Sequence, residues 1–436
     1  MPDPANDARR PYIVLAAVLL VVAVVSFRQA VLLDYDFHHF YRDASYVWQH
    51  QALNPDLDGA DPRARRQLPF YLPVVALLLS PIAAGGVVPA AVVWTVLQVA
   101  ALATCLRILG RWAETARGQP LSGLACVALA TLAALPAILV AAQFNQLSFL
   151  VLALVLAAVA ALERGKAMRA GVLFGSATVL KLLPAVFLVW LLLKRQWSAA
   201  ASLVLTVLVV ALLPCLAVFG PADTARYHKQ WWDHNVRGAP ARGMADPSLR
   251  EHFIDHRNQS VAAVVNRVFG RDHRYAVPVN FPVLSERACG RVAAGLWLAL
   301  AAGLIWTTRR PQRALREFRL RGEAACYVLA MLVFSPLFRQ YYLVWALPAL
   351  VLLLRMSGGL EAGGARAAAR TAVVLWIIGM VAWMSETARA YGVHLLMSIA
   401  IAALLLAVAA RVDRERTDSA DEDRQRSAPP PENAKA

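Results

Sequence analysis

Long apolar segments recur along the chain, and they restrict its fold more than any other feature of the sequence. Each holds roughly 20 residues with almost no charge, enough for a helix to cross a hydrocarbon core of about 30 Å. Because lipid offers the backbone no hydrogen-bond partners, a spanning segment is a helix or a strand of a closed barrel. The segments lack the alternation typical of barrel strands. We therefore expect an all-α polytopic membrane protein with about 10–12 transmembrane helices.

Composition agrees with this expectation. Hydrophobic residues make up 59% of the 436 residues and charged residues only 17%, too little polar surface for a soluble domain of this size. The first apolar stretch follows Arg9 and Arg10 and has no small-residue cleavage site, so we expect an uncleaved first span. The expected spans are 12–33, 69–85, 88–109, 122–141, 143–162, 169–193, 198–219, 289–308, 324–338, 340–354, 371–387 and 393–411.

The net charge of +16 is concentrated in short connections between apolar segments. Basic residues there orient the helices with these connections in the cytoplasm, so we expect a cytoplasmic face and no nucleic-acid partner. With the N-terminus inside, the long polar loops 34–68 and 221–288 both lie on the extracytoplasmic face of a bacterial plasma (inner) membrane. The basic clusters are Arg9 and Arg10, Lys194 and Arg195, and Arg309, Arg310, Arg313, Arg316, Arg319 and Arg321.

One stretch disagrees with this topology. Residues 107–120 carry three arginines but fall outside. They would move inside if the proline-interrupted segment 69–85 were re-entrant and if Lys181–Pro184 split the segment 169–193. Both topologies keep the two long loops on one face, and the sequence leaves the choice between them open.

The domain organisation is simple. We expect residues 1–411 to form one transmembrane domain. Residues 412–436 are charged and proline-rich with few apolar side chains, which predicts a disordered cytoplasmic tail. The five cysteines are scattered singly, without the spacing of metal ligands or of a disulfide framework. The sequence therefore predicts neither a metal site nor a cofactor.

An acidic motif follows the first span directly. Apolar and aromatic residues recur at helical spacing between residues 37 and 48, which predicts an amphipathic helix in the interface. An acid held at a lipid–water boundary has its pKa raised by desolvation towards that of a general base. For any one acid taken alone, a polar helix cap beside a membrane anchor is the alternative. The candidate site residues here are Asp36, as general base, and His38, His39 and Tyr41.

Lys181 lies deep in an apolar run and is followed three residues later by Pro184. A lysine at such depth costs about 2.5–3.5 kcal/mol on insertion scales, so it requires an anionic partner or a water-filled cavity. Snorkelling of the ammonium to the interface is the alternative.

Two further polar motifs lie at separate places in the chain. Gln143 and Asn145 belong to a polar knot between two apolar spans, which fits an ordinary tight turn as well as a substrate contact. The second long loop carries His256, Arg257, Asn258 and Gln259. Arg257 and the histidine could meet a phosphate, while Asn258-Gln259-Ser260 also fits the glycosylation pattern, a frequent false positive.

A late motif, Ser335 to Tyr342, interrupts an apolar run at Pro336. Arg339, Tyr341 and Tyr342 follow this proline at the outer end of an expected span. They are candidate substrate-binding residues. The alternative for Arg339 is an interfacial anchor.

In chain order these motifs resemble those of glycosyltransferase family 87, in the GT-C superfamily of polyprenyl-phosphate-sugar-dependent membrane enzymes. Its members carry an Asp-Phe-x-x-Tyr-Tyr-like motif after the first helix, a Tyr-Pro-Pro run and a Gly-Gln-x-Asn turn. A lysine with proline three residues on, an Asn-Gln-Ser motif and a late Ser-Pro element follow. The resemblance covers roughly residues 12–355. The similar segments here are Asp36–Tyr41, Tyr71–Pro73, Gln143–Asn145, Lys181–Pro184, Asn258–Ser260 and Ser335–Pro336.

The chain departs from the family pattern at three places. Leu72 replaces the first proline, and Ala142 stands where glycine is usual. The late motif often carries histidine, whereas this chain has Arg339-Gln340-Tyr341-Tyr342. The last departure bears on the donor-phosphate contacts and on the identity of the sugar.

The resemblance implies a GT-C-like fold and an inverting transfer of a sugar, typically mannose, from a polyprenyl-phosphate donor to a hydroxyl of a lipid or glycan outside the membrane. It implies that Asp36 takes the acceptor proton. The leaving phosphate requires positive charge, for which Arg257, Arg339, Lys181 and the loop histidines are candidates. Membrane lipids surround such an enzyme, and its apolar spans hold the polyprenyl tail.

Two other functions fit parts of the sequence. An O-antigen ligase or polymerase also uses outward loops rich in arginine and histidine, but its key loop lies late in the chain. A lipid or solute transporter would line a path at mid-bilayer with ionisable residues, and Lys181 alone fits that. A structural membrane scaffold leaves the outward acids unexplained.

Overall fold

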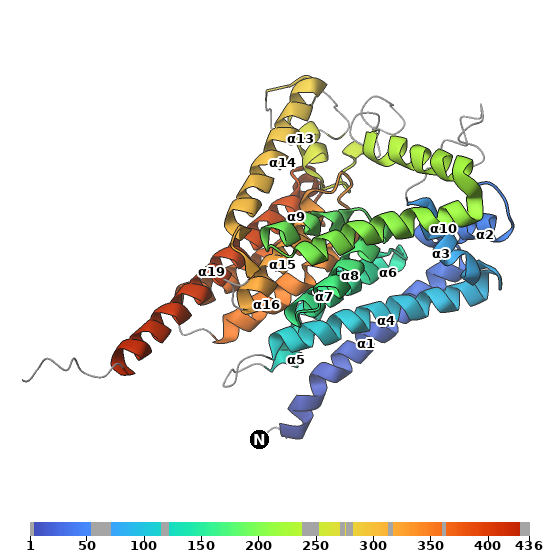
Figure 1. Cartoon of the computed structure of the whole chain (residues 1–436). Helices are drawn as coiled ribbons and strands as arrows, with labels where there is room; N and C mark the ends of the chain where they lie inside the picture. Colours follow the sequence, from blue (N-terminus) through green and yellow to red (C-terminus); the bar gives the residue numbers. More distant parts are fainter. Residues whose placement is uncertain are drawn as a thin grey trace, which may run out of the picture.

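The computed structural model describes residues 4–53, 71–114, 122–237, 253–270, 275, 282–312, 317–359 and 363–427. Over these residues the regular structure is helical throughout, without a strand (Figure 1). Seven segments are long and apolar enough to cross a membrane, or eight if the pair α5–α6, bent by 62°, counts as one span. The fold class predicted from the sequence, an all-α polytopic membrane protein, is confirmed.

The long helices account for most of the predicted spans, and the remainder are shorter than a membrane is thick. The predicted span 69–85, for example, is the 11-residue helix α3, about 16 Å long. The long segments are α1 (Pro4–Val31), α4 (Val87–Ala113), α10 (Trp197–Trp232), α14 (Glu286–Thr308), η5 with α16 (Gln340–Ala346 and Leu347–Gly359), α17 (Gly363–Ala382) and α19 (Val393–Ser427).

The other helices bend, join or cap these spans. Pro136 lies at the start of α6, where its missing N–H is tolerated and the chain bends away from α5. Gly220 has φ 73°, a left-handed value that lets α10 turn back on itself (Figure 1). These helices are α2 (Tyr35–Trp48), α3 (Pro73–Ala83), α5 (Gly123–Ala133), α6 (Leu135–Gln143), α7 (Ser148–Glu163), α8 (Ala167–Leu180), η2 (Leu183–Ala185), α9 (Val186–Leu193), η3 (Asp233–Arg237), α13 (Val261–Phe269), α15 (Glu317–Val333) and α18 (Glu386–Ala390).

Buried ion pairs mark one end of the helix bundle, which we call the charged end. Lys194 at the end of α9 pairs with Glu323 of α15, and Arg321 pairs with Glu163 at the end of α7 at 2.8 Å. Arg321 also donates to the carbonyl of Trp112 at 3.5 Å. The ends of α4, α7 and α9 and the beginning of α15 therefore meet at this end.

These contacts distinguish the two topologies that the sequence left open. The segment 107–113 at the end of α4 lies at the charged end, with the ends of α7 and α9. Three residues connect the end of α7 to the beginning of α8, and α9 returns to the charged end, so Lys181–Pro184 lies at the far end of a helical hairpin. This arrangement matches the second topology, in which α3 does not cross and residues 181–184 split a segment.

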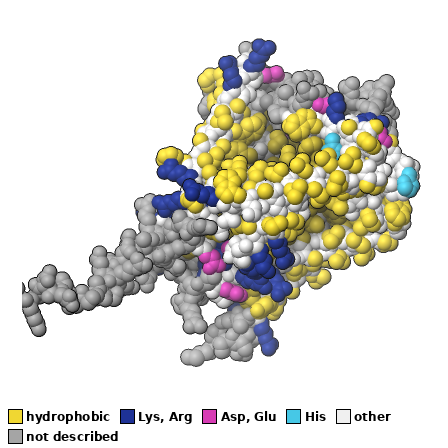
Figure 2. Space-filling model, viewed as in Figure 1, with side chains coloured by type: hydrophobic (Ala, Val, Ile, Leu, Met, Phe, Trp, Pro, Cys, Tyr) yellow, Lys and Arg dark blue, Asp and Glu magenta, His cyan; other side chains and the backbone are white. Residues whose placement is uncertain are grey.

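The outer surface suits a hydrocarbon environment. On the face shown in Figure 2, a broad band of hydrophobic side chains crosses the molecule, and lysines and arginines gather towards its margins. The helix α10 contributes Leu205, Leu208 and Leu213, which are 61%, 52% and 57% exposed. An apolar surface of this kind is stable against lipid.

The predicted disordered tail, residues 412–436, is helical over its first part. The helix α19 continues to Ser427, beyond residue 412, where the disordered tail was expected to begin. Residues 428–436 lie outside the described part of the chain, as do 54–70, 238–252, 271–274 and 276–281 in or next to the two long loops. The disorder of the last residues stays a prediction.

Candidate active site

A cavity of about 490 Å³ lies at the end of the bundle opposite the charged end. Its walls come from α2, the turn between α6 and α7, the break between α8 and α9, the segment before α13, and residues 335–342. Segments far apart in the sequence thus converge on one space. Among the candidate site residues, those that line it are Asp36, His39, Lys181, Arg257, Arg339, Tyr341 and Tyr342.

The helix α2 positions Asp36 at the edge of the cavity. The helix predicted over residues 37–48 is present, and it buries Phe37 and Phe40, whose rings lie 5.7 and 5.1 Å from that of Trp94. The Asp36 backbone N–H donates to the carbonyl of Phe144 at 3.3 Å. This docking presents the Asp36 side chain to the cavity while the apolar face of α2 is buried.

The environment of Asp36 favours proton acceptance near neutral pH. Burial raises the pKa of this carboxyl to about 6, although the positive charge of Lys181 acts in the opposite direction. A carboxylate with such a pKa is ionised at pH 7 and is still basic enough to accept a proton from a hydroxyl in a transition state. Burial, Arg42 and His38 lower the pKa of the neighbouring His39 to about 4, so its ring is neutral at pH 7.

Lys181 lies at the break between α8 and α9, where its backbone is extended. Its ammonium donates to Gln146 Oε1 at 3.0 Å and lies 4.1 Å from the centre of the Tyr342 ring. Cation–π contact and a polar partner compensate for burial of the charge. The sequence left two interpretations of Lys181, a cation in a cavity with an anionic partner and a cation that snorkels to the interface. This geometry fits the first, because Lys181 lines the cavity and the Asp36 carboxylate acts on its charge.

The polar knot after α6 is a structural turn that also supplies one cavity residue. Asn145 has φ 51° and is fully buried, and it accepts from Trp94 Nε1 at 3.2 Å and donates to the Ser26 carbonyl at 3.1 Å. Gln143 donates to the Tyr35 hydroxyl at 3.0 Å. Neither side chain lines the cavity, in contrast to Gln146. The sequence prediction missed Gln146, although it lies in the same polar knot.

Asn258 and Gln259 join the second long loop to the late motif. Asn258 Oδ1 accepts from the backbone N–H of Phe338 at 2.9 Å, and the Gln259 N–H donates to the Phe338 carbonyl at 2.7 Å. The Gln259 side chain donates to the Arg389 carbonyl at 2.9 Å. Both residues are fully buried and do not line the cavity, and their hydrogen bonds to Phe338 hold the backbone next to Arg339. Their role in substrate binding stays a prediction.

Asp255 is a cavity residue that the sequence prediction missed. Its carboxylate accepts from Arg339 Nη1 at 3.2 Å and from the Arg257 backbone N–H at 3.0 Å. Burial acts to raise its pKa, but these hydrogen bonds and the two arginine charges lower the pKa below its usual value. The sequence did hold a signal for Asp255, because this acid lies two residues before Arg257, a candidate phosphate-binding arginine. Asp255 fixes the orientation of Arg339 towards the cavity.

The remaining candidates lie outside the cavity lining. His38 is exposed, and the ring of Tyr41 stacks on Phe37 at 6.1 Å. The ring of His256 packs against Tyr275 at 5.3 Å, and burial lowers its pKa. Within the described part of the chain, no group of three or more histidine, cysteine, aspartate or glutamate side chains has the geometry of a metal site.

The comparisons with known proteins agree with the resemblance of the motifs. The profile of glycosyltransferase family 87 matches residues 70–336. A protein of Mycobacterium tuberculosis (strain ATCC 25618 / H37Rv), described as a polyprenol-phosphate-mannose-dependent alpha-(1-2)-phosphatidylinositol mannoside mannosyltransferase, is 29% identical over 302 residues, covering 66% of this chain and 62% of its own length. No solved structure gives a significant match.

A second relative carries the same description. It comes from Mycolicibacterium smegmatis (strain ATCC 700084 / mc(2)155) and is 28% identical over 222 residues, or 48% of this chain and 42% of its own length. The chain thus spans less than two thirds of the length of either curated relative.

Proposed function

Because the chain belongs to glycosyltransferase family 87, we propose that it transfers a sugar, most simply mannose, from a polyprenyl-phosphate donor to a hydroxyl of a lipid or glycan acceptor. The observation that carries this proposal is the convergence of Asp36, Lys181, Arg257 and Arg339 on a single cavity of about 490 Å³. One base and several cations are the groups that the reaction requires.

Asp36 acts as the general base. The acceptor oxygen attacks the anomeric carbon, its proton passes to the Asp36 carboxylate, and the bond from that carbon to the phosphate oxygen breaks. The raised pKa of about 6 suits this role, because the carboxylate is ionised yet basic. Attack opposite the leaving group inverts the anomeric centre, so a β-linked donor yields an α-linked product. The relatives are described as forming alpha-(1-2) linkages, which supports this stereochemistry.

The cavity cations stabilise the departing polyprenyl phosphate. Negative charge grows on the phosphate oxygens as the bond breaks, and fixed positive charge in a dry site lowers the energy of that transition state. Arg257 is exposed at the rim, while Arg339 is held by Asp255. Lys181 lines the same cavity, on the α8–α9 break. The same cavity has apolar walls at Val140, Val179 and other residues, against which the first isoprene units pack.

The arginines at the opposite end support an extracytoplasmic face for the cavity. Arg309, Arg310 and Arg319 lie at or next to the charged end, which the positive-inside rule places in the cytoplasm. The cavity then opens to the extracytoplasmic side of the bacterial plasma membrane. The relatives' descriptions name a phosphatidylinositol mannoside, which favours a lipid-borne mannoside as acceptor here.

Substitution of Asp36 tests the proposal. Membranes that contain Asp36→Asn protein are incubated with radiolabelled polyprenyl-phosphate-mannose, and the labelled product is measured. Loss of a general base lowers such rates about 10²–10⁴-fold. The matched control is Asp34→Asn, because Asp34 is two residues away, is exposed and makes no side-chain cap hydrogen bond. Full transfer by the Asp36→Asn protein, with normal folding and insertion, would reject the assignment.

A further inference from the structure

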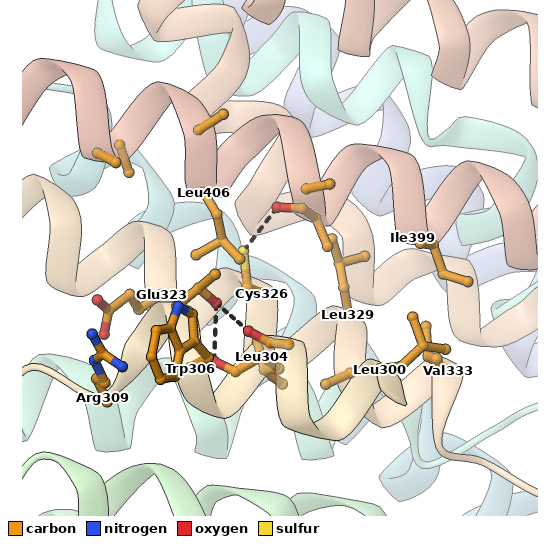
Figure 3. A pocket seen from close by; sticks show the side chains of 18 of the residues that line it. Leu300, Leu304, Trp306, Arg309, Glu323, Cys326, Leu329, Val333, Ile399 and Leu406 are labelled. Atoms are coloured by element: carbon orange, nitrogen blue, oxygen red, sulfur yellow. Dashed lines mark hydrogen bonds between the residues drawn. The ribbon is translucent and has the colours of Figure 1, made fainter. Parts of the chain in front are cut away.

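A second cavity, of about 610 Å³, lies between α14, α15 and α19 and reaches the charged end. We call it the α14 groove. It shares no lining residue with the candidate active site, and none of the candidate site residues borders it. Figure 3 shows Arg309 and Trp306 at one end of this space and Val333 and Ile399 at the other.

The walls of the α14 groove are apolar along most of their length. Aliphatic side chains from three helices face the space, and small residues such as Gly303 and Ala403 keep it wide (Figure 3). A groove with such walls suits a hydrocarbon chain rather than a polar ligand. The larger apolar lining residues are Leu300, Leu304, Leu329, Val333, Phe334, Ile399 and Leu406.

Two hydrogen bonds join α14 and α15 beside the groove. Trp297 Nε1 donates to the Val333 carbonyl at 3.2 Å, and the Thr308 hydroxyl bonds the Tyr327 hydroxyl at 3.2 Å. These points are about three turns apart on α14, roughly 16 Å. This length is about half the thickness of a hydrocarbon core of about 30 Å, so it equals the depth of one leaflet.

No other helix in the described part of the chain fills the space beside Gly303. A Cβ added at Gly303 would meet no atom within 4 Å, so close packing of another helix does not explain the glycine. Only 11% of the apolar window of α14 is buried in the protein. Dry apolar space on the lipid-facing side of a transmembrane helix is filled by lipid.

Positive charge gathers where the groove reaches the charged end. Arg309 and Arg310 are exposed at the end of α14, and Arg319 of α15 pairs with Glu323 at 3.2 Å. Lys194 pairs with the same carboxylate. The Arg309 guanidinium stacks at 3.5 Å on Trp306, which is 68% exposed, as expected of an interfacial pair.

We propose that the α14 groove binds an anionic phospholipid of the bilayer, with an acyl chain between α14 and α15 and its phosphate at Arg309 and Arg310. Guanidinium groups bind phosphate oxygens in pairs, and basic pockets between transmembrane helices on the cytoplasmic side suit anionic headgroups. The leaflet depth of the groove matches one acyl chain. The site lies at the end of the molecule opposite Asp36, so its occupancy does not depend on the proposed transferase reaction.

Lipid counting on the purified full chain tests this proposal. The protein in mild detergent is incubated with equal amounts of phosphatidylglycerol and phosphatidylcholine, and the bound lipid is measured by native mass spectrometry. We expect phosphatidylglycerol to be retained preferentially, with about a fivefold loss of preference for each arginine removed. The double variant Arg309→Gln/Arg310→Gln therefore retains the two lipids almost equally.

Two further variants separate the site from general effects of charge. Arg287→Gln/Arg291→Gln removes two exposed arginines from the other end of α14 and keeps the preference of the native protein. Gly303→Leu fills the groove and lowers retention of both lipids about fivefold, with unchanged elution on size exclusion as the folding check. Equal loss in the control pair, undiminished binding in Gly303→Leu, or displacement of phosphatidylglycerol by polyprenyl phosphate would overturn the proposal.

Discussion

Two lysines at opposite ends of the helix bundle have opposite kinds of surroundings. Lys194 at the charged end is fully satisfied, because it pairs with Glu323 and donates to the carbonyls of Thr308 at 2.5 Å and Arg310 at 2.7 Å. Within the described part of the chain, Lys181 at the cavity end donates a hydrogen bond to Gln146 and otherwise faces aromatic rings and the cavity.

The difference separates a structural cation from one that is free to act in the proposed binding site. Every direction around the Lys194 ammonium is occupied by protein oxygens that tie α9, α14 and α15 together. The Lys181 ammonium keeps unused donor capacity towards a space that also receives Asp36, Arg257 and Arg339. Polar groups that converge on a cavity, rather than on each other, are typical of a binding site.

The largest effect that this comparison predicts is on the rate of transfer after replacement of Lys181. Lys181→Gln keeps a polar side chain but removes the charge that we propose faces the donor phosphate. We expect transfer to fall about 10²–10³-fold, the cost of losing one transition-state electrostatic contact. The rate is measured with labelled donor in purified protein, alongside the thermal unfolding midpoint. Near-native transfer by this variant would remove Lys181 from the site.

Replacement of Lys194 is expected to act on stability instead. Lys194→Gln leaves Glu323 buried with Arg319 as its remaining ion-pair partner, which destabilises the fold by about 3–5 kcal/mol. Transfer per folded molecule stays within about twofold of native, since the change is far from the cavity. Thermal unfolding in detergent and the rate normalised to folded protein separate the two quantities. A loss of rate without loss of stability would contradict the comparison.

The pH dependence of transfer tests the role of Asp36. Its pKa is raised to about 6, and the ionised form is the base, so activity is full above about pH 7. Below pH 6 the carboxyl protonates and kcat/KM falls about tenfold for each pH unit. His39, with a pKa of about 4, stays neutral over this range and does not contribute. A profile that is flat from pH 5 to pH 8 would contradict the assignment.

The smallest effect is expected in the α14 groove. Gly303→Ala adds a methyl group where no atom lies within 4 Å and replaces a glycine inside a helix, which stabilises the helix by about 0.5–1 kcal/mol. Lipid retention should remain close to native, in contrast to Gly303→Leu. The thermal unfolding midpoint of delipidated protein measures the gain. A loss of stability would show that the glycine is required for packing.

The sequence alone determined the fold class and most of the site elements. Uncharged segments of the length of a membrane leave only helices, since backbone hydrogen bonds cannot be made to lipid. The helix over residues 37–48 was predicted from its apolar spacing, and it is present as α2. Asp36, Lys181, Arg257 and Arg339 were chosen from the sequence, and the structure brings these residues to one cavity.

Only the tertiary structure decided which polar residues face the cavity and which hold it together. Asn145, Asn258 and Gln259 bond the backbone of distant segments, whereas Gln146 and Asp255 turn to the cavity. The sequence does not distinguish these two groups of polar residues. The direction of each side chain depends on partners that only folding brings together. The path of α4 and of the α8–α9 hairpin was likewise revealed by a long-range hydrogen bond and ion pairs at the charged end, which hydropathy does not encode.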